Sequence, residues 1–268
     1  MSEAADKLRV SVVITTRDRP AWVRRALAGV LAQTRLPDEI VIVDDGSRTP
    51  LDPAALEGAR VLRSEEPAGA SAARNRGADA TSGEVLMFLD DDDLWMPAKI
   101  AAQVAILAVE PEVVLVYSGR AIVRDDAPDV VLREVASGVE GCVLPRLWAE
   151  NVIGVTSAVA LRRSAFAAAG GWDEQAPLRL DYDLWLRVAR HGTVRWDAGH
   201  HVRYTMFADP AQQLSARAGR HRAGVDYLLA KYAGEIDALG AAEARRARAE
   251  KWFAAARQVR RSSWAATL

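Results

Sequence analysis

The chain has 268 residues, which is long enough for one large α/β domain with a substantial buried core. Lys and Arg total 35 against 36 Asp and Glu, so a broad electropositive surface for nucleic acid is not expected. The single cysteine, Cys142, excludes a disulfide framework and a cysteine-rich metal site.

The first half of the sequence alternates strand and helix patterns. Apolar, β-branched runs predict buried strands at 8–14, 39–43, 61–62, 85–89 and 113–117. Apolar or small residues at helical spacing predict helices at 20–31, 68–80 and 97–109. This alternation predicts a largely parallel sheet with right-handed crossovers.

The second half changes character and ends in helical patterns only. It predicts a hairpin from 121–123 and 130–135, a short helix at 144–149, a strand at 155–161 and helices at 164–169 and around 184–189, with only helices from 210 onward. We expect two halves of one domain, 1–118 and 119–209, followed by a helical extension, 210–268. Every apolar run is shorter than the roughly 20 residues that span a bilayer, so we expect a cytoplasmic protein, with peripheral membrane contact left open.

Two acidic clusters follow predicted strands: Asp44–Asp45 and Asp90–Asp93. Ligands of parallel α/β sheets bind beyond the carboxyl ends of the strands. Adjacent carboxylates repel one another unless a cation or strong donors are present, and hard oxygen ligands suit Mg²⁺ or Mn²⁺. The competing interpretation is a solvated acidic loop or a helix start, where acidic residues are favoured.

Two other charged motifs each allow two interpretations. Arg74 and Arg76 lie on a predicted small-residue helix, where they could bind a phosphate or a base edge, or pair with Glu65 and Glu66. Asp181 precedes an amphipathic helix, where it could be the N-cap or a general base for an acceptor hydroxyl.

Taken together, six motifs resemble family 2 glycosyltransferases, which are inverting enzymes with the GT-A fold. In order they are VSVVITT at 10–16, AQT at 32–34 with EIVIVDDGS at 39–47, ARNRG at 73–77, FLDDDDLWMP at 88–97, GGWDE at 170–174 and DYDLWLR at 181–187. The resemblance covers roughly residues 10–204. It implies an α/β fold of the GT-A type, with a Rossmann-like, mostly parallel sheet flanked by helices and a C-terminal helical tail.

On the donor side, the resemblance implies a nucleotide site. It places Thr15, Arg17 and Asp45 at the base and Thr16 in the same nucleotide site, with Asp45 accepting the uracil N3–H if the donor is a uridine nucleotide. The later motifs imply that Arg74 lies near the base or the diphosphate. They imply that Asp90 and Asp91 lie near the ribose and the metal, and that Asp92, with Asp90 beside it, is the direct ligand of Mn²⁺ or Mg²⁺.

On the acceptor side, the resemblance implies that Asp181 is the general base. It places Gly171, Trp172 and Asp173 near the acceptor. Trp172 and Trp95 could stack on a sugar, and packing in the core is the competing interpretation for both.

The implied reaction is a single in-line displacement. The metal and arginine neutralise the charge on the departing diphosphate, and a carboxylate takes the proton of the acceptor hydroxyl. We expect a nucleotide sugar as donor, a UDP-sugar first, and a carbohydrate, lipid-linked or small-molecule acceptor, without nucleic acid. The basic segment 241–261 could pack on the core, on a second copy in a homodimer, or on an anionic membrane.

Two departures from the family pattern keep alternatives open. Leu180 stands where the family usually has Glu, and no His follows Arg203 at the expected place, because His200 and His201 come too early. A nucleotide-sugar-binding protein that has lost transfer is therefore one alternative. A nucleotidyltransferase is another, although the segment after the first strand lacks the Gly-rich loop that such an enzyme needs.

Overall fold

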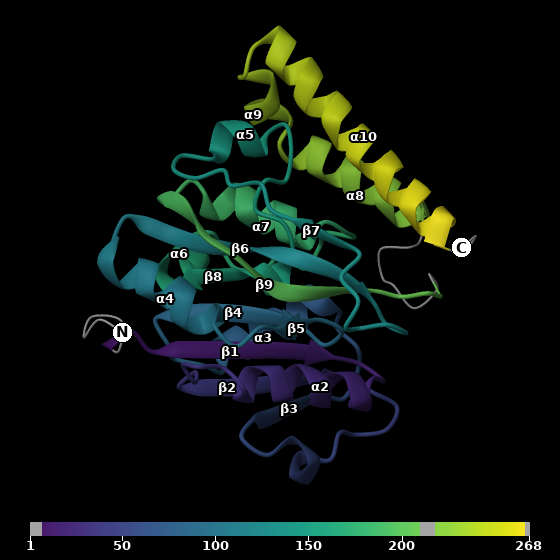
Figure 1. Cartoon of the computed structure of the whole chain (residues 1–268). Coiled ribbons are helices and arrows are strands. Elements are labelled where there is room, and N and C mark those ends of the chain that lie inside the picture. Colours follow the sequence, from purple (N-terminus) through teal and green to yellow (C-terminus); the bar gives the residue numbers. More distant parts are fainter. Residues whose placement is uncertain (1–6, 210–217, 266–268) are drawn as a thin grey trace.

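The computed structural model of the chain describes residues 7–209 and 218–265 (Figure 1). Its strands are β1 (Val10–Thr16), β2 (Glu39–Asp45), β3 (Arg60–Ser64), β4 (Val85–Asp90), β5 (Leu94–Trp95), β6 (Val113–Arg124), β7 (Arg133–Val135), β8 (Val159–Arg162) and β9 (Thr193–Met206). Its longer helices are α2 (Pro20–Leu31), α3 (Ala70–Asp79), α4 (Lys99–Val109), α7 (Leu180–Val188), α8 (Ala218–Lys231) and α10 (Ala241–Ala265). Shorter helices are η1 (Pro53–Leu56), α5 (Leu144–Leu147), η2 (Thr156–Ala158), α6 (Arg163–Ala168) and α9 (Ala233–Asp237).

The strands of the described residues form one nine-stranded sheet in the order β3-β2-β1-β4-β8-β6-β9-β5, with β7 paired to β6. Strands β1 to β4 are parallel, and β8 is antiparallel to both β4 and β6, so β6 and its parallel neighbour β9 point the same way as β4. The sheet is therefore mostly parallel, as predicted. Its carboxyl ends at β1, β2 and β4 lie at one edge.

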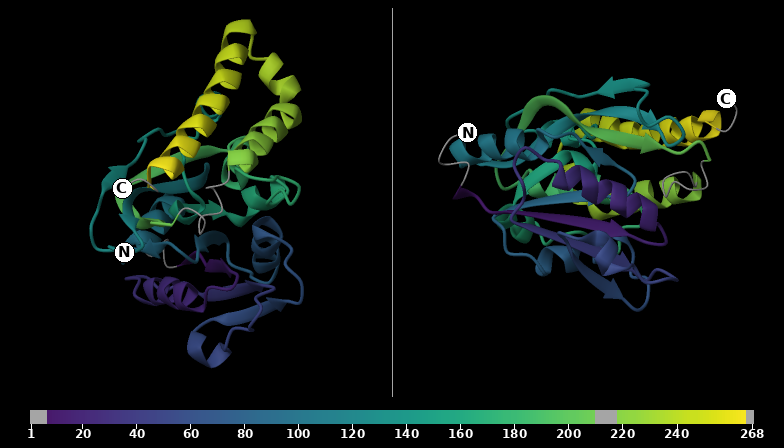
Figure 2. Two further views of the ribbon diagram at one scale, coloured as in Figure 1. Left: turned by 90° about the vertical axis from the view of Figure 1, so that its right-hand side faces the viewer. Right: turned by 60° about the horizontal axis from the view of Figure 1, so that its bottom comes forward.

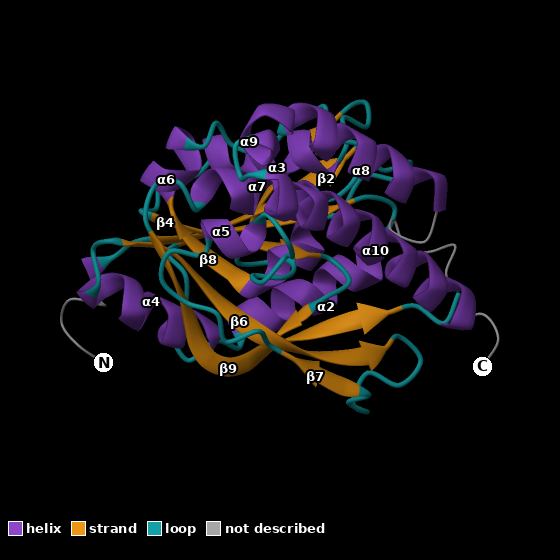
Figure 3. Ribbon diagram, turned by 90° about the horizontal axis from the view of Figure 1, so that it is seen from above, coloured by secondary structure: helices purple, strands orange, loops and turns teal. Residues whose placement is uncertain are grey.

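Alternating side chains of the central strands supply two cores, one on each face of the sheet. Val13 and Phe88 belong to the core that includes residues of α3, α5, α6, α7 and the C-terminal helices. Val12 and Ile14 belong to the other, with residues of α2 and α4. Figure 3 shows α3, α6 and α7 on one side of the sheet and α4 on the other. This two-sided burial explains why the parallel strands are almost continuously apolar.

Gly77 sets the distance between α3 and the sheet. A Cβ at this position would lie 2.3 Å from Cγ1 of Val13, so a side chain there would push the helix off β1. Because α3 carries Arg74 and Asn75, the glycine of the ARNRG motif holds these two polar side chains near the carboxyl ends of the strands.

The described structure corrects several predicted boundaries. The first strand of the predicted hairpin is the continuation of β6, which runs to Arg124 and pairs with β7. The strand predicted at 155–161 begins as the 3₁₀ turn η2. Asp44 and Asp45 belong to β2 itself and not to the following turn. The part of β9 before His200 and the two-residue strand β5 were not predicted. Both depend on pairing with distant strands, β6 for the first and β9 for the second.

The C-terminal helices pack against α7 and α5 on one side of the molecule. Figure 2 shows α8 leading away from the sheet and α10 returning beside it, with α9 between them. The α10 side chains that face the core are Ala244, Ala247, Lys251 and Ala255, spaced as one stripe of a helix. Among the described helices, none is both long enough and apolar enough to cross a membrane.

Candidate active site

Asp90 at the end of β4 and Asp91, Asp92 and Asp93 just after it, together called the acidic loop, face alternately outward and inward. The side chains of Asp90 and Asp92 are 31% and 23% exposed, whereas that of Asp91 is 8% exposed and Asp93 is almost fully buried. The outward pair is therefore available to a ligand, and the inward pair is held by the protein.

The two inward carboxylates anchor the loop to neighbouring strands. Asp91 accepts a hydrogen bond from Thr16 Oγ1 at 2.6 Å, at the end of β1, and another from Arg19 Nη1 at 3.2 Å. Asp93 Oδ1 accepts the backbone N–H of Thr205 in β9 at 3.1 Å. Asp93 Oδ2 is buried and has no hydrogen-bond partner among the described residues. These contacts connect the acidic loop to both halves of the sheet.

The loop concentrates negative charge in a partly buried place. Burial and the charge of Asp92 raise the pKa of Asp91 to about 7, against the hydrogen bonds from Thr16 and Arg19. Burial and the charge of Asp90 raise the pKa of Asp92. Burial and the charges of Asp92 and Asp90 raise the pKa of Asp93 well above its usual value. A bound cation would relieve this repulsion, because it favours the charged form of each carboxylate.

Arg74 connects the acidic loop to the GGWDE loop. Its Nη2 donates to Asp90 Oδ1 at 2.5 Å, and its guanidinium carbon lies 4.7 Å from the centre of the Trp172 ring. The competing interpretation, in which Arg74 and Arg76 pair with Glu65 and Glu66, is wrong for both arginines, because Arg74 binds Asp90 and Arg76 donates to Ser64 Oγ at 2.6 Å.

The remaining predicted donor-side residues gather at the ends of β1 and β2. Asp45 is buried and its two oxygens accept the backbone N–H groups of Ala68 and Gly69 at 2.8 and 2.9 Å, so it holds the entry to α3. Thr15 is half-buried at the end of β1 and Arg17 is exposed just beyond it. The contacts of these three with a nucleotide base stay a prediction.

Asn75 holds the GGWDE loop against α3. Its Oδ1 accepts the backbone N–H of Trp172 at 2.8 Å, and its Nδ2 donates to the Trp172 carbonyl at 2.9 Å and to Glu174 at 2.8 Å. Gly171 has φ +70°, and a Cβ there would come within 2.9 Å of Asn75 Oδ1. The ARNRG and GGWDE motifs, far apart in sequence, therefore form one contact beside the acidic loop.

Both tryptophans are buried. Trp172 packs edge-on against Phe88, at 5.2 Å between ring centres, and close to Trp185. Trp95 donates its Nε1–H to the Ser157 carbonyl at 2.8 Å and lies under the Lys99 ammonium. The structure therefore favours core packing for both, and the Trp172 ring also supports the Arg74 guanidinium.

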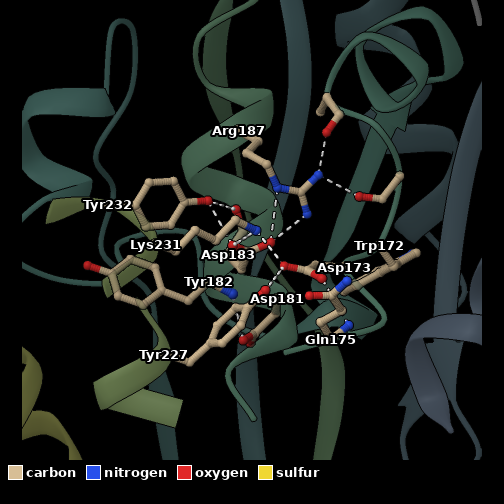
Figure 4. A network of polar contacts seen from close by, with 12 residues as sticks. Trp172, Asp173, Gln175, Asp181, Tyr182, Asp183, Arg187, Tyr227, Lys231 and Tyr232 are labelled. Carbon is tan, nitrogen blue, oxygen red and sulfur yellow. Dashed lines mark hydrogen bonds and ion pairs between the residues drawn. The ribbon is translucent and has the colours of Figure 1, made fainter. Parts of the chain in front are cut away.

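The two aspartates at the start of α7 have different environments. Asp183 is fully buried; its Oδ1 accepts from Lys231 Nζ and Tyr232 OH, each at 2.7 Å, and its Oδ2 accepts from Arg187 (Figure 4). Asp181 is half-buried and, among the described residues, its carboxylate accepts only the backbone N–H of Tyr182 at 2.7 Å.

Asp181 lies within the α7 helix and not at its N-cap, which is Arg179 in a left-handed conformation. Burial raises the pKa of Asp181, opposed by the Tyr182 N–H and by the charges of Arg179 and Arg74. The charges of Arg74 and Asp90 act on Asp181, so the carboxylate lies near the acidic loop. A carboxylate with a raised pKa and few hydrogen-bond partners can accept a proton from a nearby hydroxyl.

Asp173 forms the other half of the network in Figure 4. Its Oδ2 accepts from Lys231 Nζ at 2.5 Å and from Tyr227 OH at 2.6 Å. Burial raises its pKa, but these hydrogen bonds outweigh it and lower the pKa to about 2. Asp173, which we predicted on the acceptor side, therefore ties the GGWDE loop to α8.

Several residues of this arrangement were missed by the sequence analysis. Lys231 and Tyr232 follow Asp183 by 48 and 49 residues, and no local pattern connects them. Arg187 carries a signal that could have been used, because it lies four residues after Asp183 on the same helix face. Among the described residues, no group of three His, Cys, Asp or Glu side chains gathers as a metal-binding cluster.

The comparisons with known proteins agree with this geometry. The model of the family described as Glycosyl transferase family 2 matches residues 11–168, which is more than half of the chain. The chain belongs to glycosyltransferase family 2. Its members transfer a sugar from a nucleotide-sugar donor, so the chain is a glycosyltransferase. The matched region includes the acidic loop, Arg74 and Asn75, and it ends before the GGWDE loop and Asp181.

Relatives and solved structures extend the likeness past residue 168. An uncharacterized glycosyltransferase of Haemophilus influenzae is 24% identical over 85% of the chain and 78% of its own length. One from Rickettsia typhi is 29% identical over 70% of the chain, which spans only 61% of that relative's length. A mannosyltransferase of Pyrobaculum calidifontis, solved with GDP-Man and Mn²⁺, has a TM-score of 0.61, 20% identity and coverage of 96% of this chain and 74% of its own. S. aureus TarS 1–349 has a TM-score of 0.57, 12% identity and coverage of 85% and 72%, respectively. Both solved structures show that the chain has the GT-A glycosyltransferase fold, as predicted.

Proposed function

We propose that the chain is an inverting, metal-dependent glycosyltransferase with Asp181 as general base and Asp92 as metal ligand. The observation that carries this proposal is the contrast between Asp181 and Asp183. Asp183 forms ion pairs with Lys231 and Arg187, whereas Asp181, near the acidic loop, forms no ion pair with any described residue. A base needs a free lone pair for the acceptor proton, and Asp181 Oδ2 accepts no hydrogen bond from the described residues.

In a single displacement, Asp181 and Arg74 would have different roles. Asp181 takes the proton of the acceptor hydroxyl while the hydroxyl oxygen attacks the anomeric carbon and the bond to the diphosphate breaks. Arg74, held by Asp90, places a positive charge beside the donor. No covalent intermediate is required, so the anomeric centre inverts.

The outward aspartates of the acidic loop fit a divalent cation. They supply hard carboxylate oxygens, burial and the charge of Asp90 raise the pKa of Asp92, and the nearby Asp93 Oδ2 has no hydrogen-bond partner among the described residues. Asp92, with Asp90 beside it, would hold Mn²⁺ or Mg²⁺, and the ion would neutralise charge on the departing diphosphate. Because the protein contributes few ligands, the donor's own phosphates would complete the coordination.

We place a UDP-sugar first among the donors because Asp45 could accept a uracil N3–H in addition to the two backbone groups that it holds. The fold neighbour solved with GDP-Man makes GDP the first competitor. Thr15, Thr16, Arg17 and Asp91 complete the proposed nucleotide side.

Removing the proposed metal ligand should abolish metal-dependent nucleotide binding. We expect wild-type protein to bind UDP more tightly with Mn²⁺ than without it, and Asp92→Ala to lose this difference. Loss of one charged ligand interaction of about 2–3 kcal/mol corresponds to a thirtyfold or larger change in affinity. Calorimetric titrations of UDP, GDP and dTDP, with and without Mn²⁺, measure it.

The matched control is Asp52→Ala, which removes an exposed carboxylate from the start of η1. Binding by this variant should equal that of wild type. Tighter binding of GDP or dTDP would keep the proposed site and change the donor. If none of the three binds better with metal, the metal-dependent mechanism is wrong.

The outward face of α10 suggests where this glycosyltransferase meets its acceptor. Trp252 and Phe253 are 40% and 61% exposed, and Arg245 and Arg246 are exposed one to two turns before them. Exposed aromatic side chains beside arginines fit an anionic lipid surface. We propose peripheral contact of α10 with such a surface from the cytoplasmic side, and a lipid-linked acceptor, in preference to a free carbohydrate or small molecule.

The double variant Trp252→Ala/Phe253→Ser should therefore bind vesicles less well. We expect wild-type protein to sediment with vesicles that contain phosphatidylglycerol but not with pure phosphatidylcholine, and the double variant to lose most of this binding. Leu36→Ser, which changes a 59% exposed apolar residue between α2 and β2, serves as control. A protein that ignores both vesicles and forms a dimer that the double variant dissociates would identify a homodimer interface instead.

A further inference from the structure

Arg120 is a charged residue beside the site to which neither the motifs nor the proposed mechanism gives a role. It lies on β6, paired in register with Val135 of β7 and Val202 of β9. Its guanidinium lies over the backbone of Gly154, where an added Cβ would come within 2.8 Å of Nη1. The Gly154 carbonyl is in turn held by Trp185 Nε1 of α7 at 3.0 Å. The segment before η2 therefore leaves room for this guanidinium.

Arg120 differs from the other arginines near the acidic loop. Arg19 and Arg74 bind carboxylates of this loop, and Arg25 donates to the Asp92 carbonyl and to Thr205. Arg120 is half-buried, and its guanidinium has no hydrogen bond or ion pair with any side chain or backbone group that the structure describes. Its one close neighbour of note is the Tyr204 ring, whose centre lies 5.9 Å from the guanidinium carbon.

The surroundings of Arg120 place it between the two halves of the proposed machinery. Burial lowers its pKa, while Tyr204 and the carboxylates Asp181 and Asp93 act in the opposite direction. Asp181 is the proposed base, and Asp93 belongs to the acidic loop. A half-buried guanidinium without a partner is costly, and an anion that enters the site would supply one.

We propose that Arg120 binds the terminal phosphate of the nucleoside diphosphate leaving group and stabilises the charge that develops on it. This inference rests on the proposed function, which places the donor's diphosphate at the acidic loop. The bond between the anomeric carbon and the terminal phosphate oxygen breaks, and that oxygen keeps the electron pair. Arg120 thus acts most strongly on the diphosphate product, which carries this extra charge.

The same assignment accounts for the absence of a histidine at the expected place after Arg203 in β9. The imidazoles of the two histidines there lie against other groups: His200 Nδ1 lies 4.0 Å from Glu134 Oε2 of β7, and the His201 ring lies so close to Gly199 that a Cβ added there would come within 2.2 Å of Nε2. Tyr204, which follows Arg203, packs against Arg120 instead. A cation supplied from β6 replaces one supplied from β9.

The test compares nucleoside diphosphate with monophosphate. In the presence of Mn²⁺, Arg120→Met should weaken binding of UDP, or of whichever diphosphate the wild type prefers, by roughly ten- to hundredfold. It should leave binding of the corresponding monophosphate within about twofold of wild type. Arg120→Lys, which keeps the charge without the planar fork, should fall between the two.

Arg133→Met is the matched control, because Arg133 is an exposed arginine on the adjacent strand β7. It should change neither affinity, and thermal unfolding of all variants checks that they are folded. If Arg120→Met binds the diphosphate as wild type does, or loses both nucleotides equally, the inference is overturned. If wild type binds no diphosphate at all, the proposed donor fails first and this inference fails with it.

Discussion

Replacement of Asp181 by asparagine is expected to lower the turnover number by about a thousandfold, within the range of 10²–10⁴ that general-base catalysis contributes. Asparagine keeps the shape of the side chain and the contact with the Tyr182 N–H, but it cannot take a proton. Release of nucleoside diphosphate from the donor, with water as acceptor, measures the effect without knowledge of the natural acceptor.

The same variant should keep its fold and its donor site. Because burial raises the pKa of Asp181, its ionised form costs stability above that raised pKa, and the neutral amide removes this cost. We therefore expect Asp181→Asn to be at least as stable as wild type near pH 7 and to bind nucleoside diphosphate normally. Unchanged turnover in the variant would exclude Asp181 as the base.

The pH dependence gives a second measure of the same group. A base works in its deprotonated form, so wild-type activity should fall as the pH decreases through the pKa of Asp181. Since that pKa is raised, the fall should be centred above about 3.9, where an unperturbed aspartate titrates. The residual activity of Asp181→Asn should lack this acid limb.

Replacement of Asp183 by asparagine, unlike that of Asp181, should lower the free energy of unfolding, by about 3–5 kcal/mol. The variant leaves Lys231 and Arg187 beside a buried neutral amide, without the carboxylate that compensates both charges. The free energy of unfolding in urea measures the loss. We expect the contacts between α7 and the C-terminal helices to be affected most, because Lys231 and Tyr232 come from α8 and the residue just after it.

Glu150→Gln is the control for this experiment. It makes the same change from carboxylate to amide in an ion pair with an arginine four residues away, but both side chains are about half exposed. Such pairs contribute roughly 0.3–0.5 kcal/mol, so this variant should unfold almost like wild type. Equal stability of Asp183→Asn and Glu150→Gln would contradict the structural role of Asp183.

The sequence alone was sufficient for the order of strands and helices in the first half. Each of the strands β1, β2 and β4 is a continuous apolar run, because both faces are covered, and such runs are visible without any structure. The glycines of ARNRG and GGWDE and the acidic run after β4 were visible in the same way. The structure confirms the fold and the family that these motifs indicated.

The sequence was less informative where an element depends on a distant partner. The early part of β9 is only half-buried and lacks the apolar run of a core strand; it is a strand because it pairs with β6. The short strand β5 exists because it pairs with β9. The C-terminal helices were predicted from their local sequence pattern. Their contacts with Asp173 and Asp183 were not predicted, because these join residues far apart in the chain.

For the candidate site, the sequence by itself determined which residue types are available: paired carboxylates, arginines and small residues at the ends of parallel strands. Only the tertiary structure decided how each is used. It turned Asp91 and Asp93 inward and gave Asp183 two ion pairs, whereas among the described residues the Asp181 carboxylate and the Arg120 guanidinium have none. The physical reason is that charge and burial depend on groups brought together from distant parts of the chain, such as Lys231 and Asp183, and the spacing of neighbours along a sequence does not contain that information.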